Sequence, residues 1–259
     1  MPFSGIEASR IYWKLDGADD APPLVLLNSI GTDMDLWAGL LDRLRQTYRV
    51  LRIDTRGHGA SDVGKGDYTL SGLADDVFGA MDAAGIGAAA VAGVSLGGMI
   101  AMAMALAQPA RLTGLALICT SAAMDKTAWT DRVVKVRTDG MAAIADLAMG
   151  RFLSPGFIAE EPAIAATIRR QLLTMAPAGY AGCAAAIRDM DIAAQLQAIT
   201  CPALVVTGDR DTSTPFDGHG DYLLAHIPAA QHVALPVAHL APLEAPALLA
   251  AELLAFLKD

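Results

Sequence analysis

Ser95 lies in a short segment whose residue types and spacing suit a nucleophile. Gly93, Ser95 and Gly97 form a G-x-S-x-G pattern between a predicted strand at residues 89–94 and a predicted helix at residues 96–107. A turn this sharp is crowded, so the two glycines leave room for neighbouring backbone while the serine side chain projects above the sheet. The same pattern arises by chance in a chain rich in glycine and alanine. The chemistry therefore depends on whether the serine has partners.

A serine hydroxyl is a weak nucleophile and needs a base and an orienting acid, which follow a G-x-S-x-G serine in the order acid, then histidine. We expect His239 to be the base, because it follows a predicted strand at residues 233–235 and precedes the last predicted helix, at residues 247–257. The other four histidines lack this position. His58 precedes the serine, His226 lies in a predicted helix and His232 in a predicted strand. His219 lies in a loop that no strand precedes.

Two carboxylates follow the predicted strand that comes before the histidine. The strand is expected at residues 203–207, and Asp209 and Asp211 lie just beyond it. Asp211 is the preferred acid, because it lies where the chain turns ahead of a proline. Asp209 is more simply interpreted as a turn or surface residue. With the serine and the histidine, Asp211 completes a predicted catalytic triad.

Attack by a serine on an acyl carbon creates an oxyanion, which backbone amides must stabilise. Leu96 supplies one amide, because it directly follows the nucleophile. The second donor is expected from the loop after a predicted strand at residues 24–28, where the amide of Ile30 is the candidate. An ordinary turn from strand to loop, which Gly31 alone would explain, is the alternative interpretation.

The elements that must position these groups alternate between strands and helices. Strands are predicted at residues 10–15, 24–28, 49–54, 89–94, 112–119, 203–207 and 232–235, and helices at residues 71–84, 96–107 and 247–257. This alternation is typical of an α/β fold with a mostly parallel sheet.

The strand signal disappears between residues 122 and 197. Helical patches at residues 131–136, 141–149 and 164–175 are separated there by prolines. We interpret residues 122–197 as an all-helical cap inserted into one core domain, which comprises residues 1–121 and 198–259.

Composition excludes several classes of protein. Hydrophobic residues make up 54% of the 259 residues, which is too apolar for a disordered chain. The formal charge of −9 would repel a phosphate backbone, so nucleic acid is not an expected partner. The three cysteines match neither a disulfide framework nor a zinc site: Cys119, Cys183 and Cys201. Neither a metal nor an organic cofactor is expected.

A cytoplasmic location away from membranes is expected. Residues 1–17 carry charged side chains and lack an apolar stretch of signal-peptide length. Residues 83–110 contain no charged side chain and are long enough to span a bilayer, but five glycines divide them into a strand, a turn and a helix. We interpret this segment as the buried centre of the sheet.

Taken together, these features resemble the α/β-hydrolase superfamily, whose fold implies an eight-stranded sheet flanked by helices. Within it the chain is most similar to the 3-oxoadipate enol-lactonases, through residues 28–33 (NSIGTD), 51–62 (LRIDTRGHGASD) and 179–191 (GYAGCAAAIRDMD). Trp129 and Arg132 match the spacing of a Trp and an Arg near the cap entrance of that family. Residues 151–153 (RFL) depart from the family's Arg-Trp-Phe, and residues 238–243 (AHLAPL) lack its Ser-Asn pair.

The resemblance implies a small anionic substrate, a five-membered enol-lactone with an acetate side chain. A negatively charged protein then needs a local cation, and the cap offers Arg132, Arg151 and Arg188. A solvated helix face is the alternative for each of them. Trp129 and Phe152 are the other residues expected to contact the substrate.

Two rival functions remain open. A carboxylesterase or another lactonase would use the same triad on a different acyl substrate. A ligand receptor with a hydrolase fold would keep the triad and turn over slowly. The sequence does not distinguish a monomer from a homo-oligomer.

Overall fold

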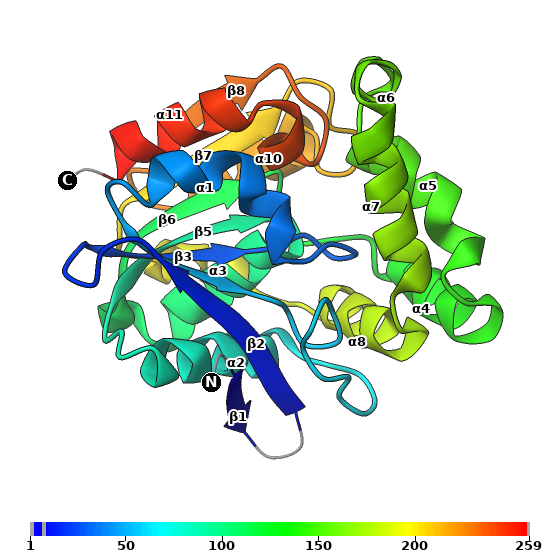
Figure 1. Ribbon diagram of the computed structural model, residues 1–259, viewed down its shortest axis with the longest axis horizontal. Helices are drawn as coiled ribbons and strands as arrows, with labels where there is room; N and C mark the ends of the chain where they lie inside the picture. Colours follow the sequence, from blue (N-terminus) through cyan, green and yellow to red (C-terminus); the bar gives the residue numbers. More distant parts are fainter. Residues whose placement is uncertain (1–2, 7–8, 258–259) are drawn as a thin grey trace.

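One sheet organises the molecule, with strands in the order β1-β2-β4-β3-β5-β6-β7-β8. The computed structural model describes residues 3–6 and 9–257 (Figure 1). The strands are β1 (Phe3–Ile6), β2 (Ser9–Asp16), β3 (Pro23–Leu27), β4 (Arg49–Ile53), β5 (Ala89–Val94), β6 (Leu112–Ile118), β7 (Ala203–Gly208) and β8 (Gln231–Leu235). From β4 to β8 neighbouring strands are parallel, and β1 and β2 extend the sheet antiparallel. The predicted fold class is confirmed.

Helices cover both faces of this sheet. On one face α1 (Ala38–Leu44) packs against α11 (Pro246–Phe256), and on the other α2 (Leu70–Ala83) packs against α3 (Leu96–Ala107) (Figure 1). All six residues of β5 are buried, as expected for a parallel strand with helices on both sides. The shorter helices α9 (Asp221–His226) and α10 (Ala241–Glu244) lie on either side of β8 in the sequence.

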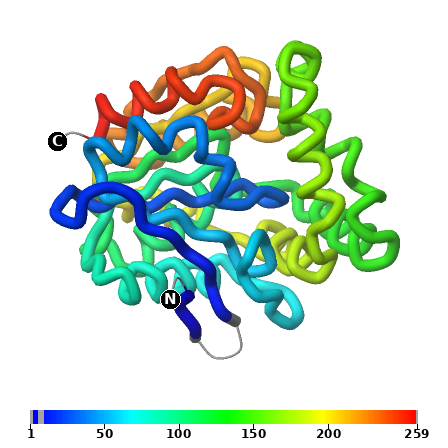
Figure 2. The backbone as a smooth tube through the Cα atoms, viewed as in Figure 1, coloured from blue at the N-terminus to red at the C-terminus, as the bar shows by residue number. Residues whose placement is uncertain are grey.

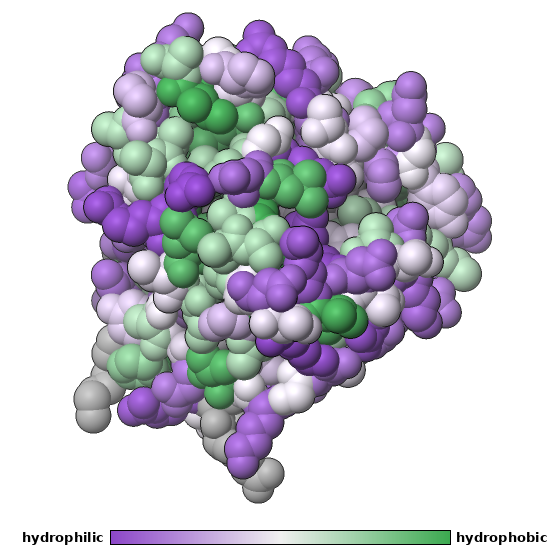
Figure 3. All heavy atoms as spheres, turned by 90° about the vertical axis from the view of Figure 1, so that its right-hand side faces the viewer, coloured by the Kyte–Doolittle hydropathy of each residue, from purple (hydrophilic) through white to green (hydrophobic). Residues whose placement is uncertain are grey.

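A group of helices lies between β6 and β7 in the sequence, beyond the carboxyl ends of the parallel strands (Figure 1). These inserted helices are α4 (Lys126–Asp139), α5 (Ala142–Phe152), α6 (Pro155–Glu160), α7 (Pro162–Thr174) and α8 (Pro177–Arg188). The last three each begin at a proline, which suits the first turn because its missing N–H has no helical partner there. On the side of the molecule that they form, hydrophobic areas are interspersed with hydrophilic ones (Figure 3).

The structure adds elements that the sequence pattern did not locate. The helix α8 is buried at every position from Gly179 to Ile187, so it has no amphipathic stripe to reveal it. The strand β1 is short and contains Ser4 and Gly5, which are poor strand signals. In the described part of the chain, no helix combines the length and the apolar character that crossing a membrane requires.

Candidate active site

Ser95 lies between β5 and α3 in a strained backbone conformation. Its φ is 54° and its ψ is −115°, a region that L-residues rarely adopt. A Cβ atom on Gly93 would lie 2.3 Å from the carbonyl carbon of Gly97, and one on Gly97 would lie 2.4 Å from the Leu27 oxygen. Both flanking glycines are therefore required by backbone contacts. The amide of Ser95 also donates to the Ile118 oxygen over 2.9 Å.

Asp211 and His239 contact each other beyond the ends of β7 and β8. The imidazole Nδ1 of His239 donates to Oδ2 of Asp211 over 2.9 Å, and the Thr214 hydroxyl donates to the same oxygen over 2.8 Å. Burial raises the pKa of Asp211, but the charge and hydrogen bond of His239 and the bonds from Ser213 and Thr214 outweigh it, so the pKa lies below its ordinary value. Asp211 is thus held as a carboxylate. Asp209 is exposed.

A cavity of about 30 Å³ brings Ser95 and His239 together under the inserted helices. Both side chains are buried, and their neighbours in the cavity wall include five further residues singled out from the sequence: Ile30, Trp129, Arg132, Arg151 and Phe152. The Phe152 ring lies almost parallel to the imidazole of His239, with 6.3 Å between ring centroids. The serine and the histidine expected to act as nucleophile and base therefore share one cavity with two guanidinium groups.

The loop that carries Ile30 is fixed by a buried histidine. The amide of Gly31 donates to Nε2 of His58 over 3.0 Å, and Nδ1 of His58 lies 3.2 Å from the Arg56 oxygen. Burial lowers the pKa of His58 to about 4, so the ring is neutral and Nε2 is an acceptor. Among the hydrogen bonds of the described residues, none is donated by the amides of Ile30 or Leu96. Within the described residues, both amides therefore have no hydrogen-bond acceptor.

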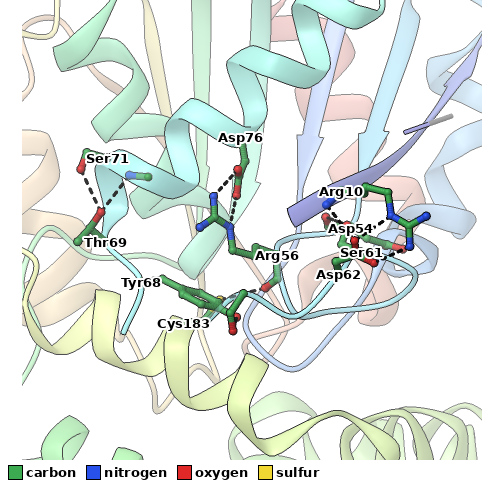
Figure 4. A network of polar contacts seen from close by, with 12 residues as sticks. Arg10, Asp54, Arg56, Ser61, Asp62, Tyr68, Thr69, Ser71, Asp76 and Cys183 are labelled. Carbon is green, nitrogen blue, oxygen red and sulfur yellow. Dashed lines mark hydrogen bonds and ion pairs between the residues drawn. The ribbon is translucent and has the colours of Figure 1, made fainter. Parts of the chain in front are cut away.

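His58 belongs to the loop at residues 54–62. Polar contacts of other residues hold this loop (Figure 4). The Asp54 carboxylate accepts from the amides of Met34 and Ala60, each over 2.8 Å. Farther along, Arg56 pairs with Asp76 on α2. At the end of the loop, the Ser61 hydroxyl donates to the backbone carbonyl oxygen of Asp54 over 2.6 Å, and the Asp62 carboxylate pairs with Arg10.

Two glycines in this loop are required by close contacts. A Cβ atom on Gly59 would lie 2.2 Å from the Asp54 carboxylate, and one on Gly57 would lie 2.5 Å from Cα of Gly179 on α8. Both have a positive φ. Figure 2 shows the segment after β4 running beside α8, where the amide of Tyr68 also donates to the Gly182 oxygen.

The three arginines of the inserted helices have different environments. Arg132 lies over the Trp129 ring, 5.1 Å from its centroid, and donates to the Tyr180 hydroxyl over 3.1 Å. Arg151, from α5, also lines the cavity and is exposed.

The expectation for Arg188 is corrected by the structure. Its guanidinium pairs with Asp67 and Asp189 instead of reaching inward, and it is absent from the described wall of the cavity. Its side chain is half-buried and its charge is satisfied by two carboxylates that are not among the described lining residues of the cavity, so Arg188 fits neither a substrate contact nor a solvated helix face.

Comparison with known proteins identifies the family. Residues 22–246 match the family described as alpha/beta hydrolase fold. The chain belongs to the α/β-hydrolase family. It is 33% identical to 3-oxoadipate enol-lactonase 2 of Acinetobacter baylyi, over 89% of this chain and 86% of that protein. The crystal structure of an enol-lactonase from Burkholderia xenovorans is 34% identical, with a TM-score of 0.96 and full coverage of both chains.

A third relative broadens the range of substrates in this part of the family. A malate-bound thermophilic esterase from Thermogutta terrifontis is 28% identical, with a TM-score of 0.91, over 98% of this chain and 96% of that one. The resemblance predicted from the sequence is confirmed, and with it the assignment of the chain as a hydrolase.

Several residues of this α/β hydrolase's site escaped the sequence interpretation. Met99, Met124 and Ala148 line the cavity from α3, the β6–α4 loop and α5, but apolar side chains in helical patterns are indistinguishable from core residues. Ser213 and Thr214 follow the acid closely, a spacing typical of side chains and amides that bind a carboxylate in a turn. Among the described residues, no group of three or more His, Cys, Asp or Glu side chains is placed to hold a metal ion.

Proposed function

We propose that this protein opens 3-oxoadipate enol-lactone, or a close lactone, to the ring-opened acid through Ser95, His239 and Asp211. The observation that carries the proposal is the shared cavity, in which Ser95 and His239 face two guanidinium groups. Similarity to enol-lactonases over nearly the whole chain supports the same substrate class.

The proposed reaction begins with transfer of the Ser95 proton to Nε2 of His239. The Oγ atom attacks the lactone carbonyl carbon, and the amides of Ile30 and Leu96 bind the oxyanion. Collapse breaks the ring C–O bond, and the protonated imidazole returns the proton to the departing enol oxygen. Because the enol is part of the same molecule, it stays tethered in the acyl-enzyme, where it tautomerises to the ketone.

Water completes the proposed cycle. His239 removes a proton from water, the hydroxide attacks the acyl carbon, and Ser95 leaves with that proton. The net change is one lactone plus one water to one 3-oxo acid. Asp211 keeps the Nδ1 proton of His239 in place and stabilises the imidazolium that forms in each half of the cycle.

Arg132 and Arg151 are the proposed carboxylate-binding groups. The protein's formal charge of −9 opposes the approach of an anion, so binding needs a local cation. A guanidinium can hold a carboxylate through two parallel hydrogen bonds. The contacts of Arg132 with the Trp129 ring and the Tyr180 hydroxyl support this role, because they hold the side chain at the cavity.

The inserted helices supply most of the substrate contacts in this proposal, so we assign residues 122–197 as the cap and residues 1–121 and 198–259 as the catalytic core. A reducing cytoplasm is the proposed compartment, since Cys119, Cys183 and Cys201 are all free thiols.

The decisive experiment is the loss of ultraviolet absorbance of the enol-lactone with purified protein. Ser95→Ala should lower kcat by several orders of magnitude, whereas Ser71→Ala, on an exposed position of α2, should match the wild type. A Ser95→Ala variant with near-native turnover would exclude the proposed nucleophile.

A carboxylesterase is the second candidate, favoured by the apolar wall that Met99, Met124 and Phe152 give the cavity and by similarity to an esterase. Comparing kcat/KM on the enol-lactone with that on short p-nitrophenyl esters separates the two. A higher value on the neutral esters would favour the esterase.

A further inference from the structure

A carboxylate outside the proposed triad joins the inserted helices to the segment that carries His239. Glu244 is the last residue of α10 and is half-buried. Its Oε1 atom accepts a hydrogen bond from the amide of Ser154. Its Oε2 atom accepts two more, from the Ser154 hydroxyl and from the amide of Ala238, and both of these measure 3.1 Å. One side chain thus binds two backbone amides that lie 84 positions apart (238 − 154).

The two amides belong to segments that each contribute one residue, Phe152 and His239, to the wall of the cavity. Ala238 directly precedes His239, and Ser154 is the N-cap of α6, where its hydroxyl accepts from the Phe157 amide over 3.3 Å. On the other side of His239, the amide of Leu240 donates to the Phe152 oxygen over 3.0 Å. Residues 152–154 are therefore joined to the residue before His239, through Glu244, and to the residue after it, through the Leu240 amide.

The direct bond from Leu240 to Phe152 and the bonds through Glu244 differ in strength. Hydrogen bonds to an ionised carboxylate are stronger than those between neutral groups, so Glu244 is the dominant link. The Phe152 ring faces His239 within the cavity, so a shift of residues 152–154 alters the cavity wall and the backbone beside His239 together. Rates of reactions between positioned groups fall steeply with displacements below 1 Å.

We propose that Glu244 is a positioning residue that couples the inserted helices to the catalytic base. By holding Ala238, it sets the direction from which His239 faces Ser95. By holding Ser154, it makes that direction depend on the position of the inserted helices. The proposal rests on the proposed function for its kinetic readout but not for its spectroscopic one.

The test compares Glu244→Gln, Ser154→Ala and the double variant. Gln keeps the shape of Glu but places an NH₂ group against an N–H donor, so we expect kcat to fall about 10- to 100-fold with KM changed less than about threefold. Ser154→Ala removes only one of the three bonds and should have a smaller effect. In the double variant the losses should not multiply, because both changes break the same link.

Glu252→Gln is the matched control, since Glu252 is half-buried on α11. Its kcat should equal that of the wild type. A thermal unfolding curve for each variant separates mispositioning from failure to fold. If Glu244→Gln keeps wild-type kcat, or if its effect multiplies with that of Ser154→Ala, the coupling is excluded.

A spectroscopic measurement makes the proposal independent of the substrate. The proton that Nδ1 of His239 donates to Asp211 is expected to give a downfield proton NMR signal, which Glu244→Gln should shift or broaden and Glu252→Gln should leave unchanged. An unchanged signal in folded Glu244→Gln would overturn the proposal. If the wild type does not open the lactone but Glu244→Gln still changes the His239 proton signal, the proposed function fails and the positioning role of Glu244 stands.

Discussion

Ser95 shows how single positions determine this site. Few L-residues adopt a φ of 54°, and the conformation persists because Gly93 and Gly97 permit backbone contacts that any Cβ atom would block. Ser95 lines the cavity in this conformation, and the Leu96 amide at the start of α3 has no helical partner. The same residue types that made the motif visible in the sequence are those that the backbone geometry requires.

His58 gives a prediction about acid stability. Its pKa falls from an ordinary 6.5 to about 4 in the folded protein because of burial. Below pH 6.5 the unfolded chain therefore binds a proton that the native state does not, so folding loses stability as the pH falls from 6.5 to 4. The loss approaches roughly 3 kcal/mol by linkage.

His58→Gln has no imidazole and should lack this contribution. Urea unfolding at several pH values checks it: the free energy of unfolding of the wild type should fall more steeply between pH 6.5 and 4 than that of His58→Gln. The buried aspartates are present in both proteins, so their contributions to the pH dependence cancel when the two free energies of unfolding are subtracted. Parallel pH profiles would contradict a neutral buried His58.

At the scale of elements, α4 and α5 each bring one arginine to the cavity, whereas the arginine at the end of α8 pairs with carboxylates elsewhere. We expect Arg132→Met and Arg151→Met each to raise KM for the anionic lactone about 10- to 100-fold, the range for loss of a charge-assisted hydrogen bond. Arg188→Met is the matched control and should leave KM unchanged.

Steady-state kinetics on a neutral p-nitrophenyl ester show whether the effect depends on charge. The KM for the ester should be insensitive to Arg132→Met and Arg151→Met. Equal increases in KM for the anion and the ester would indicate a general distortion of the cavity instead of lost charge recognition.

Elements also mark the limit of what the sequence could predict. Periodic, bounded segments such as α3 and β5 agree with their predicted ranges, because apolar pattern and flanking glycine or proline define them locally. The buried helix α8 has no polar face and escaped detection. The pairing of Arg188 could not be anticipated either, because Asp67 lies 121 positions away in the chain and only the fold brings it near.

At the scale of the whole molecule, the cavity that Ser95 and His239 share is small. Its volume of about 30 Å³ is far below the ~300 to 1,000 Å³ typical of pockets that hold small ligands. We therefore expect the inserted helices or their side chains to move when a ligand binds, and Trp129 lies in the wall of the cavity.

Tryptophan emission therefore reports on ligand binding. Adding the ring-opened product to Ser95→Ala should change the emission of the protein in a saturable way, and Trp129→Phe should remove most of that change. Trp37 is buried in the core and should contribute little. A full response in Trp129→Phe would place the movement elsewhere.

The contact between Gly57 and Gly179 has a consequence for protein engineering. Core and inserted helices meet there backbone to backbone, and a methyl group on either residue would overlap the other. A chimera that grafts a foreign helical insert onto this core must therefore carry glycine at the position equivalent to 179. Without it, the transplanted helices would be held off the scaffold whatever the quality of their remaining interface.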